Sequence, residues 1–286
     1  MCCSLDGHAH GIEDSILGAR EIIVRARSLP LLAVVAFATF ATPACGRHVD
    51  LGAIGDGGAS ILWTATFEPG DLSEWLGDGR GGTYTENVMT FPAVTTDVVH
   101  KGKYAGIATV ETPNGMPGGI VSINYLFRNQ PSPSQAFYSA WYYIPTTVAV
   151  RTYLSLLHFR CSHTGDGNDL FGIWDVNLIP RADGGLQAHL YNFVTKTNVE
   201  EPVPTVVPLG TWVHFEIMLL KAADATGRIT VWQDGVQILD NPGVMTAETD
   251  WVQWDAGVAS TDIVPTPSVI YMDDAAISLS RLGPGN

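Results

Sequence analysis

The sequence predicts an all-β fold in which antiparallel strands pack as a β-sandwich. From residue 60 onward, short runs rich in Val, Ile, Thr, Tyr, Phe and Trp alternate with clusters of Gly, Pro, Asn and Asp. No segment of this region keeps the 3.6-residue period of an amphipathic helix over three turns. The composition agrees, because 30 Gly and 17 Pro residues supply many turns while 46% of the residues are hydrophobic.

The strand runs follow one another closely, and their turns have recognisable chemistry. Asp234 and Gly235 separate two apolar runs and predict a two-residue hairpin turn. No internal repeat or long linker divides the region, so residues 60–286 are predicted to form one jelly-roll domain. The expected strands, in order, are residues 60–67, 105–110, 119–127, 136–144, 152–160, 171–179, 186–194, 211–220, 228–233, 236–240, 252–260 and 268–280.

An export signal precedes this region. Residues 29–41 form an apolar run, which follows Arg25 and Arg27 and ends at small residues. A basic region, an apolar run of about 7–15 residues and a small-residue exit are typical of a secretory signal. The run is too short to cross a bilayer, which takes about 20 apolar residues. We therefore expect a cleaved leader at residues 1–44 and an exported protein.

The residues around Cys45 resemble the lipobox of bacterial lipoproteins, in the order Ala44-Cys45-Gly46. This resemblance implies lipidation of Cys45, with residues 45–59 as a flexible Gly-rich tether. The alternative is ordinary secretory cleavage close to this point. The expected location is accordingly the bacterial cell envelope or the extracellular medium, with membrane contact only through the anchor.

Charge and cysteine content exclude some function classes. The net charge is −14 at pH 7, and the 15 Lys and Arg residues are scattered. Nucleic-acid binding needs a basic stripe, so no nucleic-acid partner is expected. A polyanionic ligand would require several Arg or His side chains to converge in one groove. Four cysteines, two of them within the leader's first three residues, do not form a disulfide framework. We expect a monomer.

Several segments resemble, in chain order, the concanavalin A-like lectin/glucanase superfamily. This resemblance implies a jelly-roll fold and a carbohydrate-related function. The superfamily includes lectins, carbohydrate-binding modules, glycoside hydrolases and polysaccharide lyases, so the fold by itself does not choose among them. The segments that carry the resemblance are Phe67–Trp75, His100–Ala105, Phe137–Pro145, Gly210–Trp212, Gly227–Gly235 and Tyr271–Ser278.

Strand alternation predicts a polar surface on one face of a sheet, because successive side chains point to opposite faces. Such a surface suits a sugar, which needs hydrogen-bonding groups for its hydroxyls and an aromatic ring for its face. The main prediction is an exported protein that holds a polysaccharide on a concave sheet; the alternatives are a solvated face and a non-catalytic surface interaction protein. The side chains expected on that sheet are His158, Arg160, Asp175, Asn177, Gln187, His189, Tyr191, His214 and Glu216.

A polysaccharide lyase that acts by β-elimination on a uronate polymer is the enzymatic alternative. Resemblance to the jelly-roll lyases implies a Tyr or His base, with Gln, His or Arg neutralising the uronate carboxylate. Leu156 stands where their Gln-x-His strand has Gln. The residues expected in these catalytic roles are Tyr191 with His158 or His189, and Arg160 with Gln187 as neutralisers. The remaining polar residues, Asp175, Asn177, His214 and Glu216, are expected to bind the substrate.

A glycoside hydrolase is a second enzymatic alternative, and it needs two carboxylates that flank the glycosidic bond. The pair that strand alternation offers is Asp175 and Glu216, from separate strands.

Acidic residues in the opening and closing strands suggest a metal. In related β-sandwich modules, acids at such positions bind Ca²⁺, and Glu68, Asp273 and Asp274 occupy similar positions here. Carboxylate oxygens are ligands that calcium prefers. The resemblance therefore implies a structural calcium ion, whereas the alternative is a set of acids that cap backbone groups. No other cofactor is expected.

Overall fold

The computed structural model describes residues 60–111 and 120–285, which belong to the compact unit Gly55–Asn286. The predicted leader, Cys45 and the tether lie outside the described residues. Within the described residues, no helix has the length and apolar character needed to cross a membrane.

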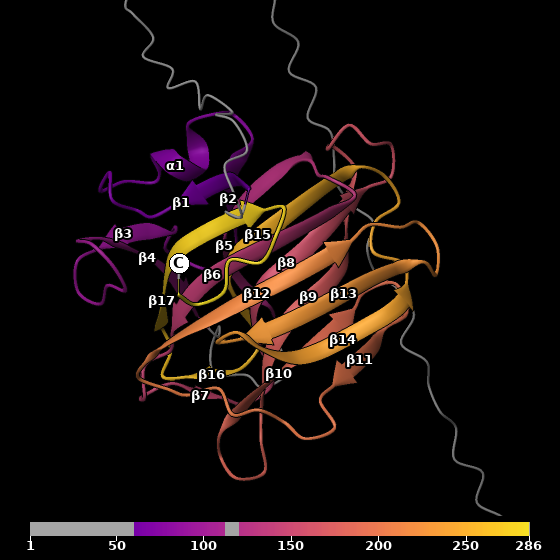
Figure 1. The fold of residues 1–286 in the computed structure, drawn as a ribbon. Coiled ribbons are helices and arrows are strands. Elements are labelled where there is room, and N and C mark those ends of the chain that lie inside the picture. The colour runs from indigo at the N-terminus through magenta and orange to yellow at the C-terminus, as the bar shows by residue number, and fades with distance from the viewer. Residues whose placement is uncertain (1–59, 112–119, 286) are drawn as a thin grey trace, which may run out of the picture. The chain divides into compact units, whose positions relative to one another are not determined.

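Two large antiparallel sheets make up the fold (Figure 1), and in that view β12, β13 and β14 lie in front of β8 and β9. Sheet A runs in the order β14 (Val236–Val244), β13 (Gly227–Gln233), β12 (Trp212–Leu220), β6 (Gln135–Tyr143), β17 (Ser268–Ser278), β4 (Ala105–Val110) and β3 (Ala93–Thr95), and β1 (Ile61–Ala65) also pairs with β17. Sheet B runs in the order β11 (Thr197–Glu200), β10 (Leu186–Asn192), β9 (Leu170–Pro180), β8 (Leu154–Ser162), β15 (Trp251–Ser260), β5 (Ser122–Pro131) and β2 (Gly81–Glu86).

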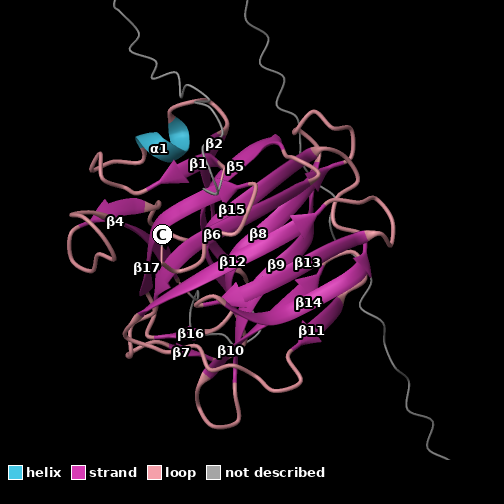
Figure 2. Cartoon of the chain, in the orientation of Figure 1, coloured by secondary structure: helices cyan, strands magenta, loops and turns pink. Residues whose placement is uncertain are grey.

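The predicted all-β, antiparallel sandwich is confirmed. The one helix among the described residues is a single turn, α1 (Ser73–Leu76), and a small separate sheet pairs β7 (Ala149–Val150) with β16 (Ile263–Val264) (Figure 2). Sequence patterns did not predict β2, β3 or β11. These strands are short or rich in Gly and polar residues, so pairing with a neighbouring strand, rather than propensity, defines them.

The core lies between the sheets and follows from strand alternation. On β12, Val213, Phe215 and Ile217 point inward and are buried. At one end of the core, the ring centroid of Trp254 on β15 lies 6.1 Å from that of Trp63 on β1 and 5.8 Å from that of Trp75 on α1. Its ring also lies 5.5 Å from Tyr138 on β6. Trp254 therefore joins sheet B to both sheet A and the opening helix.

A β-bulge on β8 decides which of its side chains leave the core. The pairing of β8 with β9 shifts by one residue between Ser155 and Leu157. Because an extra residue inverts the alternation of a strand, Ser155 joins His158 on the same face. Tyr153, two residues before Ser155, is brought to that face as well. Simple alternation along residues 152–160 would have turned Tyr153 and Ser155 away from His158.

Candidate functional site

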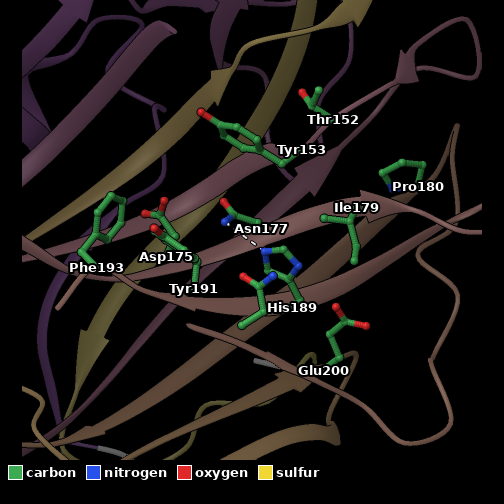
Figure 3. A pocket seen from close by; sticks show the side chains of 11 residues that line it. Thr152, Tyr153, Asp175, Asn177, Ile179, Pro180, His189, Tyr191, Phe193 and Glu200 are labelled. Atoms are coloured by element: carbon green, nitrogen blue, oxygen red, sulfur yellow. Dashed lines mark hydrogen bonds between the residues drawn. The ribbon is translucent and has the colours of Figure 1, made fainter. Parts of the chain in front are cut away.

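A groove runs across the outward face of sheet B and consists of two hollows. The large hollow has a volume of about 640 Å³ and the small hollow about 310 Å³, within the range of about 300–1,000 Å³ typical of ligand pockets. Tyr153, Asp175 and Phe193 line both hollows, so the two adjoin one another along the sheet. The large hollow is lined by Thr152, Tyr153, Asp175, Asn177, Ile179, Pro180, His189, Tyr191, Phe193, Asn198 and Glu200 (Figure 3). The small hollow is lined by Val121, Ile123, Tyr125, Tyr153, His158, Arg160, Gly172, Asp175, Phe193 and Ala259.

Strand register places the groove residues in rows. Asp175 on β9 lies opposite both His158 on β8 and Tyr191 on β10. In the next row, Asn177 lies opposite His189. The alternating residues of β9, such as Trp174 and Val176, are buried between the sheets, which leaves Asp175 and Asn177 for the groove.

His158 is held by Asp175 where the two hollows meet. The imidazole Nδ1 contacts Asp175 Oδ1, and each side chain is at most 10% exposed. A carboxylate at Nδ1 favours the tautomer with its proton there, which leaves a lone pair on Nε2. The ring of Phe193 packs edge-on against the imidazole, with the two ring centroids 5.1 Å apart. Gly172 makes room for this packing, because a Cβ at that position would lie 3.1 Å from His158 Cε1.

Tyr153 brings a phenol to the same junction. Burial, followed by the charges of Asp175 and Tyr191, raises the pKa of Tyr153 to about 12. The phenol is therefore protonated at neutral pH and can donate a proton or a hydrogen bond.

Arg160 supplies the guanidinium of the small hollow. Its Nε lies 3.1 Å from Asp255 Oδ2, close enough for an ion pair but without hydrogen-bond geometry. Asp255 is fully buried, and burial raises the pKa of its carboxyl group, whereas His158 and Arg160 lower it. Gln253 donates to Asp255 Oδ1 at 2.5 Å. Arg160 also lies over the ring of Tyr84, 4.6 Å from its centroid, so both contacts fix the guanidinium beside the groove.

Two buried polar atoms in the large hollow have no partner among the described residues. Asn177 Nδ2 lies 3.3 Å from His189 Nε2, as the dashed line in Figure 3 marks. Asn177 Oδ1 and His189 Nδ1 are left without a hydrogen bond, although these side chains are 4% and 6% exposed. An unsatisfied buried polar group costs about 1–3 kcal/mol, so such atoms indicate a place for a hydrogen-bonding ligand.

We expect acid to destabilise the fold through His189. Burial lowers the pKa of His189 from its ordinary value of 6.5, while Glu200 and Asp175 act to raise it. A lowered folded-state pKa means that the unfolded chain binds the proton more readily, so the contribution is complete above pH 6.5 and is lost as pH falls below it. Urea unfolding at about pH 7 and pH 5 measures this loss. His189→Gln should reduce the difference between the free energies of unfolding at the two pH values. An unchanged difference would contradict the assignment to His189.

The structure brings together most of the predicted groove residues. Tyr191, His189, Asp175 and Asn177 line the large hollow, and His158 and Arg160 line the small one. Gln187, predicted as a neutraliser, lies on β10 opposite Ile179, is buried and lines neither hollow.

The placement of His214 and Glu216 on the same sheet is wrong. Both lie on β12, which belongs to sheet A. Glu216 accepts hydrogen bonds from Arg281 Nε at 2.8 Å and from the Leu282 N–H at 2.6 Å, and so holds the C-terminal segment. The hydrolase pair of Asp175 and Glu216 is wrong for the same reason, because the two carboxylates lie on different sheets. Alternation shows that a strand has a polar face but not which sheet the strand joins.

The acids predicted to bind calcium mostly engage backbone groups. Glu68 Oε1 accepts the N–H groups of Lys103 and Tyr104 at 2.8 and 3.0 Å. Asp273 accepts the N–H groups of His100 and Asp274. No group of three or more His, Cys, Asp or Glu side chains in the described part of the chain is placed to hold a metal ion. Calcium binding stays a prediction.

Comparison with known proteins identifies the fold. No protein-family model matches the sequence, and no curated protein matches it. Among solved structures, the chain is similar to an endo-beta-1,4-glucuronan lyase from the fungus Trichoderma reesei, with 16% identity, a TM-score of 0.54 and coverage of 77% of this chain and 96% of that chain. The chain is a jelly-roll β-sandwich. The marine PL-14 alginate lyase from Aplysia kurodai (12% identity, TM-score 0.52, coverage 77% and 99%) and the cellulose-induced protein Cip1 (15%, 0.51, coverage 78% and 99%) share this fold.

Proposed function

We propose that the chain is a polysaccharide lyase, which cleaves a uronate-containing polymer by β-elimination in the groove of sheet B. The observation that carries the proposal is the small hollow, whose lining brings Tyr153 and Arg160 together with the His158–Asp175 pair. An acid, a base and a cation then face the same space. Two proteins with the same fold, named glucuronan lyase and alginate lyase, support this choice of reaction.

β-Elimination needs one proton removed and one supplied. The base takes the proton from C5, beside the uronate carboxylate, the C4–O4 bond breaks, and a C4–C5 double bond forms as the leaving oxygen is protonated. No water or cofactor is consumed. His158 is the base, because Asp175 engages Nδ1 and leaves Nε2 able to accept a proton. Tyr153 is the acid, because its protonated phenol lines the same hollow as His158 and can donate to the leaving oxygen.

Arg160 neutralises the carboxylate of the reacting uronate. A guanidinium beside that carboxylate stabilises the negative charge that develops when C5 loses its proton. Asp255 and Tyr84 hold Arg160 in place. Asp175 acts as a positioning residue for His158. Asn177 Oδ1 and His189 Nδ1 hydrogen-bond hydroxyls of an adjoining sugar, and Tyr191 and Phe193 give that sugar an aromatic wall.

The decisive experiment exposes the full chain to a panel of uronate and neutral polysaccharides while ultraviolet absorbance of unsaturated chain ends is followed. Absorbance should rise with at least one uronate polymer and with no neutral polymer. The absence of any rise across the uronate polymers would overturn the lyase proposal.

Polysaccharide binding without turnover is the second candidate. It is favoured by the carboxylates of the groove, because Asp175 and Glu200 line it and Asp255 lies behind Arg160. Carboxylates accept hydrogen bonds from the hydroxyls of a neutral sugar and repel a uronate. Retention on a neutral polysaccharide in a pull-down, with no absorbance change, would favour this candidate.

We also propose that the protein works outside the cytoplasm, since polymeric substrates of this kind agree with the export that the leader predicts. Lipid attachment at Cys45, a monomeric state and structural calcium stay predictions.

A further inference from the structure

The groove has unlike charge in its two hollows. Arg160 lines the small hollow and gives it a positively charged guanidinium. The lining of the large hollow contains Asp175 and Glu200 but neither Lys nor Arg. Lys196 lies outside this lining, exposed, with its Nζ 5.7 Å from the centre of the Phe193 ring. Because Asp175 lines both hollows, the charge that distinguishes the large hollow is that of Glu200, whereas Arg160 lies at the other end of the groove.

Glu200 is the exposed carboxylate at the far end of the large hollow. It lies on β11 opposite His189, and Figure 3 shows it beyond His189, on the side away from Tyr153. Asp175 is already engaged with His158. Among the described residues that line the groove, none forms a hydrogen bond or ion pair with the Glu200 carboxylate. A ligand in the large hollow meets this charge directly.

The other polar groups of the large hollow suit hydroxyls. Burial lowers the pKa of His189 from its ordinary value of 6.5, which favours the uncharged imidazole. With Asn177 Nδ2 donating to Nε2, the His189 Nδ1–H is a free donor and Asn177 Oδ1 a free acceptor. Sugar hydroxyls, which both donate and accept, suit these two groups. A carboxylate gains no charge pairing from a neutral imidazole and an amide, and like charge at Glu200 and Asp175 opposes it.

We propose that Glu200 makes this site selective for a polymer in which a uronate is followed by an uncharged sugar. This inference rests on the proposed lyase function. The reacting uronate lies beside Arg160 in the small hollow, and the adjoining sugar, which enters the large hollow, carries hydroxyls but no carboxylate. A homopolymer of uronate would place a second carboxylate in the large hollow with Glu200, and salt screens their repulsion over about 8 Å at physiological ionic strength.

The test compares two polymers of matched length, a uronate homopolymer and a polymer that alternates uronate with neutral hexose. For the native chain, kcat/KM should be about tenfold higher on the alternating polymer. Glu200→Gln should raise kcat/KM on the homopolymer about fivefold or more, mainly by lowering KM, so that the ratio of kcat/KM on the alternating polymer to that on the homopolymer falls. High salt should reduce the difference in kcat/KM on the homopolymer between the native chain and the variant, because salt screens the repulsion between Glu200 and the second carboxylate.

Glu201→Gln is the matched control. It removes the same charge one residue away, where the carboxylate accepts from Thr205 Oγ1 at 3.0 Å and does not line the groove. The ratio of kcat/KM on the two polymers should stay unchanged in this variant. If Glu200→Gln turned over both polymers with an unaltered ratio of kcat/KM, the proposed selectivity would be wrong but the lyase function would stand. The absence of turnover on both polymers and across the uronate panel would overturn the lyase function and the selectivity together.

Discussion

Replacing Tyr153 by Phe should lower kcat on a uronate polymer on the order of 10³-fold, because a general acid contributes about 10²–10⁴-fold to such a step. The leaving oxygen would then depart without a proton. Phe keeps the ring that lines both hollows, so binding of the polymer should change little. Initial rates from ultraviolet absorbance give kcat, and a pull-down with the same polymer measures binding.

Two variants sharpen this test of Tyr153. Tyr271→Phe removes a phenol whose pKa burial also raises, but from β17 of sheet A, and it should leave kcat unchanged. Tyr191→Phe keeps the aromatic ring in the large hollow and removes only its hydroxyl, so it should lower kcat much less than Tyr153→Phe does. If Tyr191→Phe abolished turnover while Tyr153→Phe retained it, the acid would be Tyr191 and the proposed role of Tyr153 would be wrong.

Replacing Trp254 by Ala should lower the free energy of unfolding by about 4 kcal/mol, within the range of large-to-small core substitutions. The indole is fully buried and touches aromatic rings from β1, α1 and β6. Its loss opens a cavity at the point where both sheets and the opening helix meet. Urea unfolding followed by circular dichroism measures the change.

Trp212→Ala is the control for this prediction, because Trp212 is only partly buried on β12. It should cost roughly 1 kcal/mol or less. A similar loss for both variants, or a loss below about 1.5 kcal/mol for Trp254→Ala, would show that the aromatic cluster does not join the sheets as described.

The sequence by itself determined the fold class and much of the groove. Alternation along β9 and β10 predicted that Asp175, Asn177, His189 and Tyr191 share one surface, and all four line the large hollow. This prediction succeeds because the two strands are adjacent in sequence and form a hairpin with regular pairing. Side-chain direction is then a local property of the chain.

Only the tertiary structure decided which strands face one another and where alternation breaks. His214 and Glu216 have the same alternating pattern as the groove residues, yet β12 pairs with β6 in the other sheet. Asp255 lies behind Arg160 because β15 inserts between β8 and β5, far from both in sequence. Tyr153 reaches the groove because the bulge on β8 reverses the alternation of side chains between the two faces of the strand. Long-range pairing and a one-residue bulge leave no periodic trace in the sequence, since both depend on which backbone groups find partners once the sheets have formed.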